Sequence, residues 1–233
     1  EEGEVLRGLE QAQREREEEE EQDQRLRQEE LLFRIAEDVT QLLAGHREAM
    51  TATREIDADR TADRPSRAQR LRLKRIAKDE EGLGSRAGEL AAALEEEGSL
   101  VFRQVLLGIE QDLGRVAERL DEQGDYDTGT RVQALQEDVE EALVWLKRAL
   151  EQEQERRRQG EQEQQEAGGG GDGAQPPGEN RLVPDEAELK LLRQMEVDVV
   201  QRIEELTQLY PELLEPGREI DPMVLETIQR LAE

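Results

Sequence analysis

The sequence predicts an all-α protein: an elongated antiparallel helical bundle or coiled coil, with a disordered linker and a C-terminal helical hairpin. Charged residues make up 39% of the 233 residues and aromatic residues only 2%, a composition too poor in bulky side chains for an ordinary globular core. Apolar residues recur at alternating steps of three and four, the period of helices with narrow buried seams. No stretch of the sequence requires a β-strand.

The formal net charge of −27 limits the classes of partner. Nucleic acids and anionic membranes bind positive surfaces, so we expect neither as a partner. The chain has no cysteine, which excludes disulfides, thiol catalysis and cysteine-ligated zinc. No apolar run approaches the roughly 20 residues that span a bilayer, so we expect no transmembrane segment. None of these features determines the cellular compartment.

Residues 1–31 are polar and highly charged, and are either a solvated helix or disordered. Acid-first pairs four residues apart, such as Glu21 and Arg25, are compatible with the helical alternative. Residues 32–150 then hold four segments with apolar seams and short connections. This pattern predicts a four-segment bundle of antiparallel neighbours.

Breaks and caps separate these four segments. Ser66 follows a proline and can cap a second helix at about 67–96, which Gly98 ends. The third helix covers about 100–122, and Thr130 with Gln133 has capping-box spacing at the start of the fourth. The seam residues, segment by segment, are Leu32, Ile35, Ala36, Val39, Leu42, Leu43, His46 and Met50; Leu73, Ile76, Leu83, Ala87, Leu90 and Leu94; Phe102, Val105, Leu106, Ile109, Leu113, Val116 and Leu120; and Val132, Leu135, Val139, Ala142, Leu143, Leu146 and Leu150.

Residues 151–183 are polar, then rich in Gly and Pro, and predict a low-complexity linker. Residues 184–233 form the predicted hairpin. Asp185 can cap its first helix with Glu188 in capping-box position, and Asp221 can cap its second, whose pattern stops in mid-period as if truncated.

A hairpin of about 50 residues has too little core to be stable alone, so its seam is expected to dock on another helical surface. The predicted docking residues are Leu189, Leu192, Met195, Val199 and Leu206.

A basic segment, residues 64–78, holds seven basic residues and no acid. One interpretation is a contact site for phosphate or anionic lipid. The interpretation we favour pairs the segment with the glutamate run at 17–21 on a neighbouring helix, because the surrounding field is negative. The candidate anion-contact residues are Arg67, Arg70, Arg72, Lys74, Arg75 and Lys78.

Few residues could perform catalysis or bind a metal. His46, the only histidine, occupies a seam position, where it either responds to pH or, as we favour, sets helix register. Asp125 and Asp127 begin a calcium-loop pattern, but Gly129 stands where a ligand belongs, which favours a turn and a cap. Carboxylates on solvated faces lack the concave site of acid–base catalysis. We therefore expect no enzyme activity, no metal and no cofactor.

Two segments carry a family resemblance. "DTGTRVQALQEDVEEALVWL" (127–146) and, beyond a Gly/Pro/Gln-rich stretch, "LVPDEAELKLLRQMEVDV" (182–199) resemble a family of uncharacterised bacterial helical, coiled-coil-rich proteins. In that family a D-x-G turn opens a helix with a Q-x-L-Q core, and an ELKLLR helix follows the linker. The family's Thr-Gln pair is Val132-Gln133 here, and Glu196 replaces a Gln. The resemblance implies an envelope-associated, non-enzymatic scaffold and supplies no catalytic residue.

The sequence thus predicts a non-enzymatic structural or scaffolding coiled-coil protein that acts through helix–helix docking. Its partner is a protein, either another copy in a homo-oligomer or a different chain. The alternative function is an adaptor whose tethered hairpin binds a foreign protein.

Overall fold

The computed structural model describes residues 2–60, 64–166, 182–209, 225 and 228. Every regular element in this part of the chain is helical, which confirms the all-α prediction. The chain divides into two compact units, 1–187 and 188–233, which are described separately. The elements are α1 (Glu2–Ala58), α2 (Arg67–Glu96), α3 (Leu100–Leu120), the 3₁₀ turn η1 (Glu122–Gly124), α4 (Thr130–Glu166) and α5 (Asp185–Leu209).

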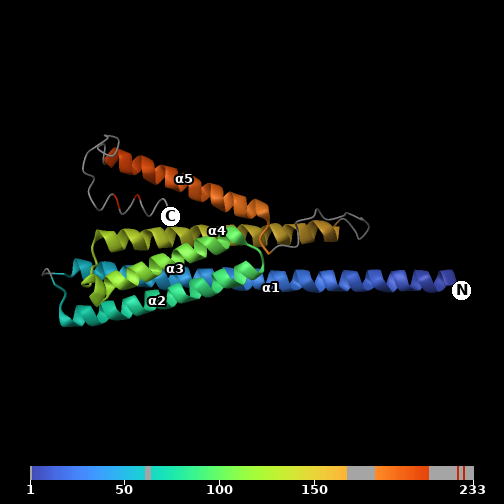
Figure 1. Cartoon of the computed structure of the whole chain (residues 1–233), viewed down its shortest axis with the longest axis horizontal. Helices are drawn as coiled ribbons and strands as arrows, with labels where there is room; N and C mark the ends of the chain where they lie inside the picture. The colour runs from blue at the N-terminus through green and yellow to red at the C-terminus, as the bar shows by residue number, and fades with distance from the viewer. Residues whose placement is uncertain (1, 61–63, 167–181, 210–224, 226–227, 229–233) are drawn as a thin grey trace. The chain divides into compact units, whose positions relative to one another are not determined.

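The helices α1 to α4 form an antiparallel bundle within the first unit (Figure 1). Each packs on two others: α1 contacts α2 and α4, and α3 contacts the same two helices. Ion pairs join Arg47 to Glu140 at 2.7 Å and Arg54 to Glu137 at 2.8 Å, and their order along the two helices shows that α1 and α4 are antiparallel. Short connections make sequential neighbours antiparallel, and α4 closes the ring by returning to α1.

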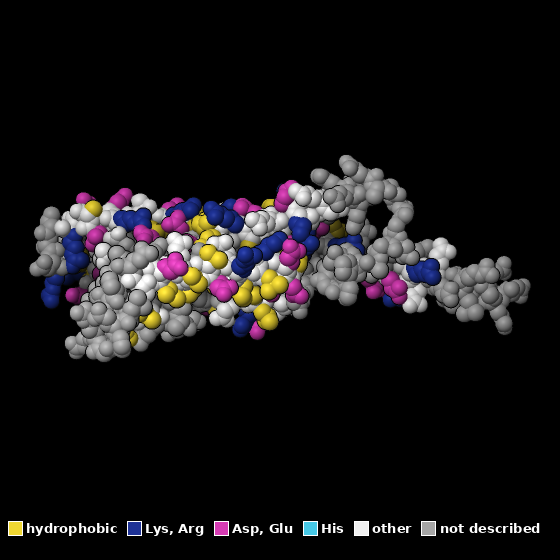
Figure 2. All heavy atoms as spheres, turned by 90° about the horizontal axis from the view of Figure 1, so that it is seen from above, with side chains coloured by type: hydrophobic (Ala, Val, Ile, Leu, Met, Phe, Trp, Pro, Cys, Tyr) yellow, Lys and Arg dark blue, Asp and Glu magenta, His cyan; other side chains and the backbone are white. Residues whose placement is uncertain are grey.

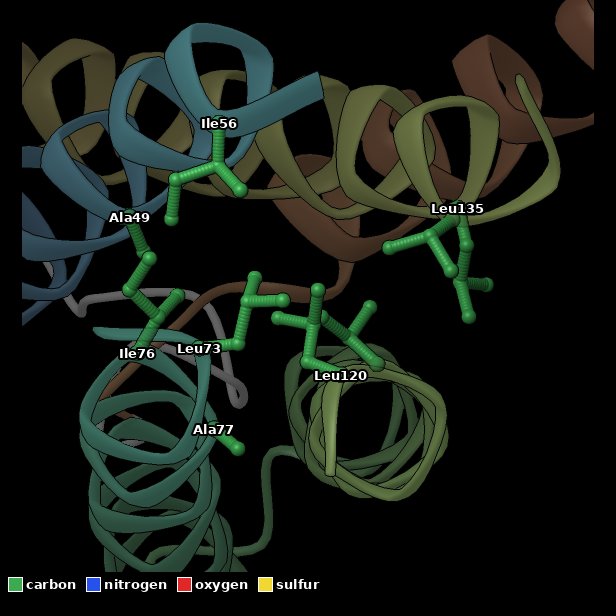
Figure 3. Close-up of a cluster of buried hydrophobic side chains, with 9 residues drawn as sticks. Ala49, Ile56, Leu73, Ile76, Ala77, Leu120 and Leu135 are labelled. Carbon is green, nitrogen blue, oxygen red and sulfur yellow. The ribbon is translucent and has the colours of Figure 1, made fainter. Parts of the chain in front are cut away.

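The core of the bundle draws on all four helices. Figure 3 shows side chains of this cluster converging from different helices. Burying branched aliphatic side chains stabilises a bundle by roughly 1.5–3 kcal/mol each. The cluster consists of Ala49 and Ile56 from α1, Leu73, Ile76 and Ala77 from α2, Val116 and Leu120 from α3, and Val132 and Leu135 from α4.

Most predicted seam residues are buried. The seams of α1 and α3 are buried throughout, and that of α4 is buried except for the half-buried Ala142. In α2, Leu83 and Leu90 are only half-buried, while Gly84 and Ala91 occupy the buried positions. A Cβ on Gly84 would lie 3.4 Å from the carbonyl oxygen of Glu110, so small residues let α2 approach α3 closely.

The ends of α2 follow the predicted chemistry. The Ser66 hydroxyl accepts a hydrogen bond from the Gln69 backbone amide at 3.3 Å, and the Gln69 side chain accepts one from the Ser66 amide at 2.8 Å. At the other end Gly98 has φ +73°, and the amide of Ser99 donates to the carbonyl of Leu94. This backbone pattern is a Schellman motif, which glycine permits without strain.

The capping box predicted for the fourth helix is wrong. Thr130 is the first helical residue, and Gly129 precedes it. The Gln133 side chain instead donates to the Thr128 carbonyl at 2.8 Å and to Asp57 of α1 at 3.2 Å. A tertiary contact therefore takes the side chain that the local pattern assigned to the cap.

The helices are longer than predicted at two places. Residues 2–31 continue without a break into α1, so the helical alternative applies to them. The helix α4 continues to Glu166, which overturns the prediction of a linker from residue 151. The carboxylate of Glu153 is buried and accepts hydrogen bonds from Arg156 and Arg157 at 2.9–3.0 Å, within one helical turn.

The end of the predicted linker is also structured. Leu182 and Val183 are buried, and Arg157 donates to the Leu182 carbonyl at 2.7 Å. Residues 167–181, the remainder of the linker, lie outside the described residues. The predicted N-cap of α5 is wrong by one residue, because Asp185 is itself the first helical residue and Pro184 precedes it. The second helix of the predicted hairpin lies outside the described residues except for Leu225 and Ile228, which are helical.

Candidate interaction surfaces

The first candidate surface is an apolar stripe on α5, formed by Leu189, Leu192, Val200 and Ile203. Their exposed fractions are 67%, 50%, 50% and 48%. Steps of 3, 8 and 3 residues keep all four on one side of a helix with about 100° between residues. Figure 2 shows hydrophobic side chains lying open among charged ones. The α5 stripe is thus an exposed apolar face that one charged residue, Glu196, interrupts midway between Leu192 and Val200.

The predicted docking residues fall into three groups. Leu189 and Leu192 belong to the α5 stripe, whereas Met195 and Val199 are half-buried. The side chain of Leu206 lies outside the described residues. The sequence prediction assigned one narrow seam to this helix and missed Leu191, which is 4% exposed. The signal for Leu191 was that the apolar residues of α5 cover more of its circumference than one seam does.

The second candidate surface is the basic segment at the start of α2. The structure does not pair it with the glutamate run at 17–21, as we had expected. Arg72 pairs with Glu55 at 3.4 Å, and Lys74 with Glu122 at 3.2 Å. The reason is distance: α2 is antiparallel to α1, so its first turns lie beside the C-terminal end of α1 and far from the glutamates.

Aromatic contact accounts for part of the same segment. Tyr126 has φ +59°, and its ring lies 6.0 Å from the Arg70 guanidinium and 5.9 Å from the Lys74 ammonium. Cation–π contacts of this kind at exposed sites stabilise by roughly 0.5–1 kcal/mol. No partner among the described residues engages Arg64, Arg67, Arg75 or Lys78, and all four are exposed. These four are the cations of the segment that remain available.

The turn that resembled a calcium loop is a helix entry. One oxygen of Asp127 accepts a hydrogen bond from the Gly129 amide at 2.9 Å, and the hydroxyl of Thr128 donates to Asp57 at 2.7 Å. The first bond is turn chemistry, which is the interpretation we favoured, and the second ties the turn to α1. No group of three or more potential metal ligands occurs in the part of the chain that the structure describes.

A buried polar cluster lies inside the bundle. His46 of α1 is 0% exposed, with Nδ1 2.8 Å from Glu80 of α2 and Nε2 2.8 Å from the backbone carbonyl of Gln136 in α4. The Gln136 side-chain amide donates to the other Glu80 oxygen at 2.9 Å. Three helices are therefore joined by one set of hydrogen bonds, a role consistent with setting register.

Protonation of this cluster follows from its geometry. A carbonyl only accepts, so Nε2 carries a proton, and Nδ1 shares a second proton with the Glu80 carboxylate. Burial by itself lowers the pKa of His46, but the hydrogen bond and charge of Glu80 outweigh it, so the pKa lies above its ordinary value. The hydrogen bond to Gln136 and the charge of Glu140 act in the same direction.

Sequence reasoning found His46 and missed its partners. Glu80 is fully buried and follows Ile76 at a step of four along the α2 seam, so a charged residue on an apolar period was the available signal. Gln136 is also buried, next to Leu135, and one of its side-chain atoms, Oε1, has no hydrogen-bond partner. Its pairing across three helices could not be read from local sequence.

Within the part of the chain that the structure describes, no helix combines the length and the hydropathy of a membrane span. No model of a protein family matches this chain, and no curated protein or solved structure matches it either.

Proposed function

We propose that this chain is a non-enzymatic structural protein that acts by helix–helix docking, with the α5 stripe as its docking element. The observation that carries the proposal is the exposure of four aliphatic side chains on one side of α5. Exposed apolar surface of this kind typically marks an interaction site. The charged residues beside it, such as Lys190 and Arg193, and Glu196 within it restrict which partner and register fit.

The partner is another helical surface. An amphipathic helix docks by laying side chains of one face, spaced by three and four residues, into a groove of its partner. The steps of 3, 8 and 3 in the α5 stripe keep its four aliphatic side chains on one such face. We propose a second copy of the chain as this partner, which would make the chain a scaffold. The adaptor alternative uses the same stripe for a different protein.

Solution mass tests the proposal. We expect the weight-average mass from light scattering to exceed the monomer mass of 26.6 kDa as concentration rises. Replacing Leu192 and Val200 by Asp should lower this mass, because a carboxylate in a buried helical interface costs several kcal/mol.

The matched control is Val197→Asp. Val197 has the same 50% exposure as Val200 but lies roughly 100° from the centre of the stripe, so its replacement should leave the mass unchanged. An equal effect of the control and the stripe variant would contradict a role for this face. A monomer at every concentration would favour the adaptor instead.

A further inference from the structure

Two exposed stripes of opposite charge have matching spacing. On α1, Glu19, Asp23, Leu26, Glu30 and Phe33 are all exposed and follow steps of 4, 3, 4 and 3, which keeps them on one face; we name this the arm stripe. On α2, Arg67, Leu71, Lys74 and Lys78 are exposed and follow steps of 4, 3 and 4; we name this the basic stripe.

The two stripes are complementary when they run antiparallel. Lys78 then faces Glu19, Lys74 faces Asp23 and Arg67 faces Glu30. In the same alignment Leu71 meets Leu26, and these leucines are each 57% exposed. Base opposes acid at three positions, and leucine opposes leucine at the fourth, so a single register satisfies the whole set.

The outer charged pairs in this alignment lack partners in the structure. Among the described residues, no ion pair or hydrogen bond engages the side chains of Glu19, Glu30, Arg67 or Lys78. Lys74 already forms ion pairs with Asp121 and Glu122, and the side chains of both acids are exposed to solvent. The complementary charges are therefore available without breaking a buried interaction.

The stripes cannot meet within one chain. The contact between Glu80 and His46 places Lys78 level with about residue 48 of α1, because the two helices are antiparallel. That level is about 29 residues beyond Glu19, which is about 43 Å along a helix. Figure 1 shows the N-terminal part of α1 running on past the ends of α2 and α3.

We propose that the arm stripe of one copy packs antiparallel on the basic stripe of a second copy. The same offset separates Arg67 from Glu30, so the copies are related by a shift of about 43 Å along α1. The four-helix part beside residues 32–58 of α1 is about 40 Å long, so consecutive bundles lie end to end, with each arm alongside the neighbour's α2. The contact joins two different surfaces and therefore leaves one of each free, which produces an open chain of copies.

The net charge of the molecule does not prevent this contact. At physiological salt the screening length is about 8 Å, so the facing side chains dominate over distant charges. A polyanion such as a nucleic acid offers the same negative charge without the two apolar positions that Leu26 and Phe33 supply. The arm of a second copy matches both the charge and the leucine.

Charge reversal in the full-length chain tests the pairing. One variant carries Arg67→Glu and Lys78→Glu, and the other carries Glu19→Lys and Glu30→Lys. In sedimentation velocity at about 50 mM salt, where screening is weak, the wild-type protein should form larger species that dissolve at about 500 mM salt. Each variant alone should lack these salt-sensitive species. An equal mixture of the two variants should recover those species, since each restores the other's complement.

A matched control separates loss of the pairing from the change in net charge. Arg148→Glu with Arg158→Glu changes the net charge equally at two exposed positions on α4 that lack partners among the described residues, and should associate like the wild type. Circular dichroism confirms that each variant is folded. A wild-type protein without salt-sensitive species at low salt, or single variants that form such species without each other, would overturn the pairing.

This inference does not involve α5, so it can be separated from the proposed function. Leu192→Asp with Val200→Asp should leave the charge-dependent species intact, whereas raising the salt to about 500 mM should dissolve them. Loss of these species in the α5 variant alone would assign the assembly to α5 and refute the pairing of the two charged stripes.

Discussion

The buried pair of His46 and Glu80 shows how one polar residue ties helices together. Each ring nitrogen of His46 bonds a different helix, α2 through Glu80 and α4 through the Gln136 carbonyl. A shift of either helix by one residue would leave a buried charge or carbonyl without its partner, which costs several kcal/mol. The pair therefore penalises alternative registers more strongly than an aliphatic layer would.

We expect the stability of the bundle to fall on the alkaline side because of this pair. The folded-state pKa of His46 is raised above its unfolded value, so the stabilisation is complete below about pH 6.5 and is lost as the pH rises through the folded-state pKa. Urea unfolding from about pH 6 to about pH 9.5 should show this decrease.

The reference for this measurement is His46→Leu combined with Glu80→Leu, which removes both members of the pair and places apolar side chains at both positions. The unfolding free energy of the wild type minus that of the reference should decrease as the pH rises. If this value stays constant or increases over the range, His46 is not charged in the folded bundle.

At the scale of single helices, glycine lowers stability at one position inside α2 and raises it at another just after α2. Gly82 is helical and exposed, and a Cβ there would meet no atom within 4 Å. Gly98 has φ +73° and closes the Schellman motif. The first position gains nothing from glycine, whereas the second requires it.

Gly82→Ala should therefore stabilise the protein by about 0.5–1 kcal/mol, the helix propensity difference between the two residues. Gly98→Ala should destabilise it by about 1–2 kcal/mol, because the left-handed conformation strains a Cβ. Thermal unfolding of both variants beside the wild type measures the two effects. Shifts of the same sign would contradict the assigned conformations.

The long polar helices depend on charge as well as on seams. The helix α4 passes through "EQEQERRRQG", which lacks an apolar period, with Glu153 bonded to Arg156 and Arg157. Arg157 also reaches the Leu182 carbonyl. A charge network and one tertiary hydrogen bond thus continue a helix where hydrophobic pattern alone predicts its end.

At the scale of the whole molecule, closure of the ring by α4 on α1 makes the bundle cooperative. The cluster around Leu120 contains side chains from every helix of the bundle. Removing volume there affects all four helices at once, because buried neighbours can only partly fill a cavity.

Leu120→Ala should cost about 2–5 kcal/mol of unfolding free energy, the usual range for a buried leucine. Leu100→Ala, the same substitution in the same helix at a side chain that is 66% exposed, should change it by no more than about 0.5 kcal/mol. Denaturant unfolding compares the two. Similar losses for both would mean that Leu120 does not lie in the common core.

The sequence by itself determined the helical class, the seams of α1 and α3, and the caps at Ser66 and Gly98. These are local properties: a period of 3.5 residues, a hydroxyl before a helix or a glycine after it acts within one or two turns.

Only the tertiary structure decided which residues face one another across helices. It placed Glu80 opposite His46, drew Gln133 away from its expected cap to Asp57, and extended α4 beyond residue 150. It also turned Arg67 and Lys78 outward, far from the glutamates of their own chain. Helix pairing depends on the register of the helices relative to one another, and a seam records which face of a helix is buried without recording what covers it.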